Sequence, residues 1–347
     1  MRRFCWPFMF LLCLCLMGCG AGEAKKVYKQ AEKDLNQGSY TYALEGFEES
    51  YGAGYEVTLS LRGAGICSLR LGDYQKAVEL FSEALSQEKV GKALQRDLLC
   101  YRITARIAMG AYDKAREDCG RLTALGVMDA DGYFLFGQVA LAQDSYDEAR
   151  MNFETSYSSD PSYDRAIQIY EVYVDKGMEA DGTYFLELSL NRSPSSAEDY
   201  CDCGRVYYYM GDYDNARTQL IEAQKKGSKE AILLLGMSYM GKGDYSNARA
   251  MYTQYVTQVE ASGRGYNGIA MCEIAQGNYA AAREVIAQGI PHATTEELKA
   301  LLFNEVVSYE KEYDFASACQ KAEEYMQAFP EDKQMERELT FLRSRIQ

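Results

Sequence analysis

Small and apolar residues recur along the chain at a nearly fixed interval, in step with a short sequence pattern. The pattern reads Gly-Asp-Tyr-x-x-Ala, and most copies are followed four residues later by a large apolar residue. Final residues of successive copies lie 32 to 38 residues apart, most often 34. Such a period predicts stacked helix pairs rather than one globular core. The nine copies, three unchanged, five variant and one degenerate, are Gly38–Ala43, Gly72–Ala77, Gly110–Ala115, Asp144–Ala149, Gly177–Gly182, Gly211–Ala216, Gly243–Ala248, Gly277–Ala282 and Lys311–Ala316.

Each position of the pattern has a predicted structural role. Gly ends one helix in the left-handed conformation, and the Asp, Asn or Ser after it caps the next helix. Ala lies where the two helices approach closely. Most copies carry a small residue twelve positions before this Ala: Ala31, Gly65, Gly137, Gly204, Gly236 and Ala270. The large residues four positions after it, one helical turn away, are Phe47, Phe81, Phe153, Leu186, Leu220, Tyr252 and Ile286.

Two copies depart from the pattern. The third has Ile103 at the small position and Cys119 at the large one, and it carries a four-residue insertion. The fifth lacks both the Tyr and the Ala. Pro161 and Pro194 follow their copies by twelve residues, where the second helix has to stop.

Small, aromatic, Ala, aromatic and Pro residues at these offsets resemble the tetratricopeptide repeat, over residues 25–330 and about nine repeats. The resemblance implies an all-α fold, a right-handed α-α superhelix (solenoid) of TPR-like helix pairs. Residues 331–347 are predicted to form a C-terminal capping helix, with Met335, Leu339 and Leu342 on one face.

The first residues predict export. Arg2 and Arg3 precede an apolar run from Phe4 to Met17, which is too short for a membrane-spanning helix. The run ends in Leu16-Met17-Gly18-Cys19, which resembles a bacterial lipobox. This resemblance implies a signal peptide over residues 1–18, a lipid on Cys19, and a short tether over residues 19–24. The mature protein would then lie in the bacterial cell envelope, lipid-anchored on the extracytoplasmic face. An ordinary cleaved signal or an uncleaved anchor is the alternative.

The net charge of the chain argues against two classes of binding partner. The formal net charge is −14, which repels nucleic acid and argues against the solenoid lying flat on anionic lipid. The membrane is therefore expected to be contacted through the lipid anchor only.

Seven cysteines follow Cys19, an odd and scattered set that does not form a disulfide framework. Cys201 and Cys203 point apart on a helix and cannot share a metal. These cysteines are predicted to be packing residues.

Catalytic motifs are nearly lacking. His292 is the single histidine, which argues against a histidine triad or a histidine-rich metal site. Residues 263–268 spell Gly-x-Gly-x-x-Gly, yet they open a helix within the repeat rather than follow a strand. We therefore expect no catalysis, no cofactor and no metal.

The resemblance implies a concave groove lined by the first helix of each pair, which in the family usually holds a peptide or a partner's helix. We predict a membrane-anchored scaffold that binds a protein or peptide partner there, while the oligomeric state stays open. The alternative is a lipoprotein that captures a cell-wall glycan or small polar molecule, with Tyr207–Tyr209 as a stacking platform. The groove residues predicted to bind are Tyr28, Arg62, Phe134, Gln138, Arg205, Tyr208, Met237 and Asn267.

Overall fold

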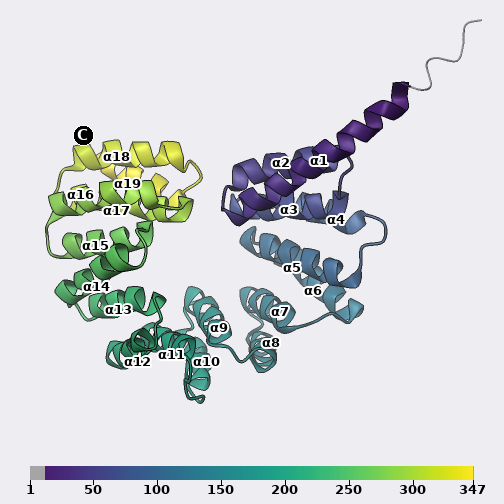
Figure 1. The fold of residues 1–347 in the computed structure, drawn as a ribbon. Helices are drawn as coiled ribbons and strands as arrows, with labels where there is room; N and C mark the ends of the chain where they lie inside the picture. Colours follow the sequence, from purple (N-terminus) through teal and green to yellow (C-terminus); the bar gives the residue numbers. More distant parts are fainter. Residues whose placement is uncertain (1–11, 347) are drawn as a thin grey trace, which may run out of the picture. The chain divides into compact units, whose positions relative to one another are not determined.

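The computed structural model describes the backbone of residues 12–346 and the side chains of residues 22–346. The chain divides into two compact units, residues 1–161 and 162–347. In both units the regular elements of the described residues are helices, and consecutive helices pack in pairs (Figure 1). The predicted all-α class and helix-pair solenoid are confirmed.

The first unit holds the first four pairs, with odd-numbered helices first in each pair. Its helices are α1 (Leu12–Asn36), α2 (Tyr40–Gly52), α3 (Val57–Arg70), α4 (Tyr74–Ser86), α5 (Lys92–Ala108), α6 (Tyr112–Leu125), α7 (Ala130–Ala142) and α8 (Tyr146–Ser159). Residues 19–24, expected as a tether, belong to the continuous helix α1. Most of the predicted signal peptide, residues 1–11, lies outside the described residues.

The second unit holds five pairs and one further helix. Its elements are α9 (Tyr163–Asp175), α10 (Glu179–Ser189), α11 (Ala197–Tyr209), α12 (Tyr213–Lys225), α13 (Glu230–Gly241), α14 (Tyr245–Gln258), α15 (Gly263–Ala275), α16 (Tyr279–Gly289), the short 3-10 helix η1 (Ile290–His292), α17 (Thr295–Lys311), α18 (Phe315–Ala328) and α19 (Lys333–Arg345). Over residues 12–346, no helix combines the length and the apolar character needed to cross a membrane.

Within a pair, the large residue of the second helix packs directly on the small residue of the first. A Cβ atom added to Gly65 would lie 2.5 Å from the Phe81 ring, and one added to Gly137 would lie 2.5 Å from Phe153. Both rings are fully buried. Because no side chain fits between ring and backbone, glycine sets how closely the two helices approach.

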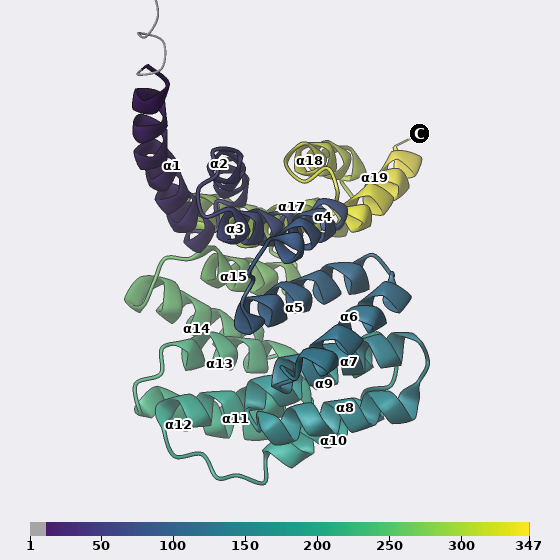
Figure 2. The same ribbon diagram turned by 90° about the vertical axis from the view of Figure 1, so that its right-hand side faces the viewer.

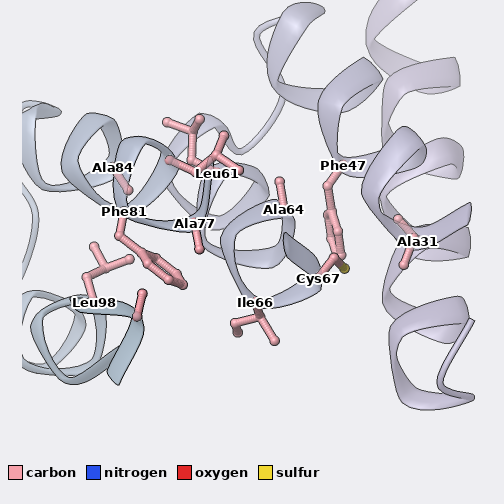
Figure 3. Packing of buried hydrophobic residues seen from close by; sticks show 13 residues of the cluster. Ala31, Phe47, Leu61, Ala64, Ile66, Cys67, Ala77, Phe81, Ala84 and Leu98 are labelled. Carbon is pink, nitrogen blue, oxygen red and sulfur yellow. The ribbon is translucent and has the colours of Figure 1, made fainter. Parts of the chain in front are cut away.

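The same large residue also joins one pair to the next. Tyr252 of α14 would lie 2.8 Å from a Cβ on Gly236 of its own pair and 2.6 Å from one on Gly268 of the following pair. Phe47 would likewise lie 2.6 Å from a Cβ on Gly63 in α3. Figure 3 shows the Phe47 ring between the helices that carry Ala31 and Cys67. The aromatic side chain thus packs within a repeat and between repeats at once.

In the third and ninth pairs the sizes of these two partners are exchanged. In the third pair Ile103 replaces the small residue and Cys119 the large one, and both are fully buried. In the ninth pair Val306 and Ala322 are exchanged in the same sense. The combined volume is kept, which is the kind of change a packed core tolerates best.

The predicted register of the ninth repeat was wrong by two residues. The left-handed position that glycine usually fills is occupied by Tyr313, with φ of 64°, and Asp314 caps α18. The buried alanine is Ala318, whereas Ala316 is exposed. The pattern here is therefore Tyr313-Asp314-Phe315-x-x-Ala318. The prediction matched Tyr313 to the tyrosine of the pattern, whereas Phe315 occupies that position.

The predicted capping holds for aspartate only. The Lys76 backbone N–H donates to Asp73 Oδ1 at 3.1 Å, and equivalent bonds reach Asp212 and Asp244. Ser39 and Asn278, which were also expected to cap, accept no such bond. The Asn278 side chain instead donates to Glu273 at 2.9 Å.

A buried ion pair holds the divergent third repeat together. Arg102 donates to the two carboxylate oxygens of Asp118 at 2.8 and 2.6 Å, and to Ser82 at 2.8 Å. Arg106 adds a bond to Asp118 at 2.7 Å. These contacts link α4, α5 and α6. They satisfy a carboxylate that is almost completely buried.

The last helix, α19, packs one face on the end of the second unit, beside α18 (Figure 2). Met335, Leu339 and Leu342 are its buried residues, as predicted. Asp332 at its start accepts from Tyr325 at 2.7 Å and pairs with Lys299 at 2.9 Å. Both contacts hold the pKa of Asp332 well below its usual range, although burial alone would raise it.

Replacing Gly65 by isoleucine should destabilise the protein by about 1–3 kcal/mol, because the new side chain overpacks against Phe81. Chemical denaturation measures this loss. The double variant Gly65→Ile/Phe81→Cys copies the third repeat and should recover part of it. Gly120 is the control, since a Cβ there meets no atom within 4 Å, and Gly120→Val should change stability by less than about 0.5 kcal/mol. Equal effects at Gly65 and Gly120 would contradict the packing argument.

Docking of α19 should weaken as the pH rises. Burial, with the neighbouring Glu338 carboxyl second, raises the pKa of Glu310 on α17 to about 7, from a usual 4.5. Glu310 Oε1 is buried and accepts no hydrogen bond from a described donor. A carboxyl whose pKa is raised by folding favours docking fully below pH 4.5 and loses that contribution as the pH rises to about 7.

Hydrogen exchange of the α19 amides, corrected for intrinsic rates, tests this pH dependence. Protection should fall between about pH 4.5 and 7 in the parent and stay level in Glu310→Gln. Glu336→Gln, at an exposed position of α19, should behave as the parent does. An unchanged pH profile in Glu310→Gln would refute the role of this carboxyl.

Candidate functional site

The predicted binding residues all lie on first helices and are all half-buried. Tyr28, Arg62, Phe134 and Gln138 belong to the first unit, on α1, α3 and α7. The other four belong to the second unit: Arg205 and Tyr208 on α11, Met237 on α13 and Asn267 on α15. The predicted placement on first helices therefore agrees with the structure, and each unit has its own face. Cys19 lies where the side chains are not described.

In the first unit, arginines of this face are already bound to acids of the next first helix. Arg62 of α3 forms an ion pair with Asp97 of α5, and its guanidinium lies 5.5 Å from the centre of the Tyr101 ring. One repeat further, Arg96 of α5 pairs with Asp131 of α7 at 2.7 Å. We call such contacts between successive first helices the polar ladder. Arg62 therefore contributes to the stacking of repeats.

Two aromatic residues of the first unit also serve packing. The Tyr28 ring lies 5.6 Å from the rings of Phe47 and Tyr55, both edge-on. Burial and a hydrogen bond to Glu32 raise the pKa of Tyr28 to about 12. Phe134 lies 5.9 Å from Phe153, the large residue of its own pair. Both side chains are half-covered by the repeat core.

The polar ladder continues in the second unit. Arg205 of α11 forms ion pairs with Asp164 of α9 and, at 3.2 Å, with Asp202 of its own helix. On α15, Arg264 pairs with Glu230 of α13 at 2.9 Å. The amide of Asn304 on α17 donates to Asn267 Oδ1 at 2.8 Å. Two of the predicted binding residues, Arg205 and Asn267, are thus members of the ladder.

Beside the ladder the second unit presents a row of methionines, which we call the methionine strip: Met237 and Met240 of α13 and Met271 of α15. Met237 and Met240 are half-buried against the core, and Met271 is 37% exposed. The Cys272 thiol donates to Met240 Sδ at 3.9 Å, which joins the two helices. The strip offers apolar surface that adapts to different partners, since methionine is flexible and polarizable.

Tyrosines beside the strip pack on one another. Tyr208 lies 6.0 Å from Tyr209 and 5.7 Å from Tyr213. Tyr209 in turn lies 5.9 Å from Tyr170, and its hydroxyl donates to Glu171 at 2.8 Å. Burial, followed by the contact with Glu171, raises the pKa of Tyr209 to about 12. The rings therefore form an interlocked cluster.

The thiols and glycines singled out in the sequence are packing groups. Six of the seven cysteines of residues 22–346 are buried, and burial raises the pKa of the Cys119 thiol to about 12. A Cβ on Gly268 would lie 2.6 Å from the Tyr252 ring, so the Gly-x-Gly-x-x-Gly stretch serves helix packing. His292 is exposed and stacks on Tyr266 at 5.8 Å. The side chains of residues 22–346 contain no cluster of three His, Cys, Asp or Glu that could hold a metal.

Comparison with known proteins supports the repeat assignment. The tetratricopeptide repeat model matches residues 28–91 and 233–293, which cover part of pair one, all of pair two, most of pair seven and all of pair eight. These two segments therefore carry tetratricopeptide repeats, a scaffold that suits protein–protein interaction in general. No curated protein matches the chain.

Several solved structures are similar to this chain. A tetratricopeptide repeat protein from Parabacteroides merdae is 13% identical, with 72% of this chain and 98% of its own covered and a TM-score of 0.42. PilW, described as a widely conserved type IV pilus biogenesis factor, is 13% identical over 60% of this chain and 98% of its own, with a TM-score of 0.42. MamA from Desulfovibrio magneticus is 19% identical over 48% and 93%, with a TM-score of 0.40.

Proposed function

We propose that this protein is a scaffold of the bacterial cell envelope, held at the extracytoplasmic face of a membrane by a lipid on Cys19. A protein or peptide partner binds along the first-helix face of the second unit, and the protein performs no catalysis. The methionine strip is the observation that carries this proposal. It combines an exposed apolar side chain with neighbouring amide and hydroxyl groups, and such a mixture suits an amphipathic peptide segment.

Because the ladder arginines already form ion pairs, we expect them to contribute less to partner binding than the methionines do. Arg205 already holds two carboxylates of its own unit, so a partner has to break these contacts to use it. Met271 is partly exposed in the free protein, and its Sδ accepts a long hydrogen bond of 3.7 Å from the Asn267 amide, which is a weaker contact for a partner to displace than an ion pair. Apolar contact with the strip is therefore expected to dominate, with the ladder fixing the spacing of the helices.

Glycan capture receives less support. A stacking platform needs an aromatic face open to the sugar ring. Tyr208 and Tyr209 instead contact each other, and their neighbours Tyr213 and Tyr170 cover further ring surface. Binding of a glycan fragment by the second unit, with no peptide partner, would favour that alternative.

The lipid anchor is testable by mass spectrometry of the N-terminal peptide from the protein made in a bacterium with lipoprotein processing. We expect a chain that starts at Cys19 and carries acyl groups on its thiol. Cys19→Ser should abolish the modification and release the protein from the membrane fraction. A free thiol at Cys19 in the mature protein would refute the anchor.

The role of the methionine strip is testable with a partner captured by crosslinking in cells. Met271→Ala should weaken its binding by about 1 kcal/mol, which is about fivefold in the dissociation constant. Met151 on α8 is the matched control, as a methionine that is 61% exposed on a second helix. Met151→Ala should leave binding unchanged. If both variants bind as the parent does, the strip is not the contact surface.

A further inference from the structure

Helix α1 carries a basic face that the rest of the described chain leaves exposed. Lys25, Lys26, Lys29 and Lys33 are all exposed. At 3.6 residues per turn the four side chains fall within an arc of about 100°. Ala24 and Ala31, which are buried, lie on the opposite side of the helix. The lysines therefore point away from the repeat core.

Among the described side chains, these four lysines lack the ion pairs that some other cations of the first unit form. Within the part of the chain whose side chains are described, none of the four forms an ion pair. By contrast, Lys76 pairs with Glu48 at 2.8 Å, and Arg62 and Arg96 belong to the polar ladder. An unpaired group of four like charges is unusual in a chain whose formal net charge is −14. It indicates a partner outside the chain.

The position of this face indicates which partner. Among the described residues α1 is the first helix, and its N-terminal part extends beyond α2 (Figures 1 and 2). The same continuous helix includes Cys19. With a rise of 1.5 Å per residue, Lys25 lies about 9 Å and Lys33 about 21 Å along the axis from Cys19.

We propose that the basic face of α1, formed by Lys25, Lys26, Lys29 and Lys33, binds the anionic headgroups of the membrane to which Cys19 is attached. The proposal rests on the proposed function only in taking Cys19 as the point of membrane attachment. Electrostatic attraction falls off within a Debye length of about 8–10 Å, so all four lysines contribute only if α1 lies along the bilayer surface.

This contact replaces the expectation that the lipid is the sole attachment to the membrane. A basic surface next to an acyl anchor is a second signal, and the two together hold more firmly than either alone. The acidic remainder of the chain is repelled by the same headgroups. The two effects together would hold α1 on the bilayer and keep the acidic surfaces of the chain away from it.

Vesicle flotation tests the basic face separately from the anchor. Three proteins that begin at residue 19, without the apolar run from Phe4 to Met17, are compared, each with Cys19→Ser so that none is acylated. They are the parent, a variant with all four α1 lysines changed to glutamine, and a control with the same loss of charge elsewhere. The control carries lysine-to-glutamine changes at the exposed positions Lys89, Lys114, Lys229 and Lys333. Circular dichroism checks that each protein keeps its helix content.

On vesicles of phosphatidylcholine and phosphatidylglycerol in equal parts, the α1 variant should bind at least about tenfold more weakly than the parent. The control should bind as the parent does, and added salt should weaken the parent. Equal binding by the α1 variant and the control, or equal binding of the parent to pure phosphatidylcholine, would overturn the proposal. Failure of the anchor would appear instead as a free Cys19 thiol in the native protein.

Discussion

The contact on which the rest of the structure depends is the one between a small residue of a first helix and a large residue of the second helix sixteen positions later. In Gly65–Phe81 and Gly137–Phe153 the ring rests against backbone, so the helix separation is fixed by the absence of a side chain. Tyr252 shows that the same side chain reaches the following pair. Repetition of one local contact thus builds each stack without long-range pairing.

This contact explains which features the sequence could predict. Its two partners recur at constant offsets, so the helix pairs, the buried alanines and the closing helix α19 follow from spacing alone. The exchange of sizes at Ile103 and Cys119 can also be predicted, if the combined side-chain volume of the two positions is considered rather than each residue by itself. The register of the ninth repeat could not be predicted from the pattern. Tyr313 takes a left-handed position that glycine usually fills, and a second aromatic residue, Phe315, starts α18.

The candidate site was predictable in position but not in chemistry. Offsets from the repeat pattern place residues such as Arg205 and Asn267 on the first helices, as found. Their partners, Asp164 and Asn304, lie 41 and 37 residues away, whereas Arg62–Asp97 and Arg96–Asp131 each span 35 residues, so the offset between contacting side chains varies from pair to pair. The side chains that were predicted to bind a partner therefore hold successive helices at their spacing. The methionine strip is then the better candidate for the surface that binds a partner. The buried Arg102–Asp118 pair lies within a single helix pair and was not predicted either.

We expect α1 and Cys19 to contact the membrane and the methionine strip to contact the partner. Site-specific photo-crosslinking in cells tests the central claim, partner binding on the strip, most directly. A photoreactive residue in place of Met271 should give a reproducible crosslinked protein, while the same residue in place of Met151 should not. Crosslinks of equal yield from both positions, or from Met151 alone, would contradict the account.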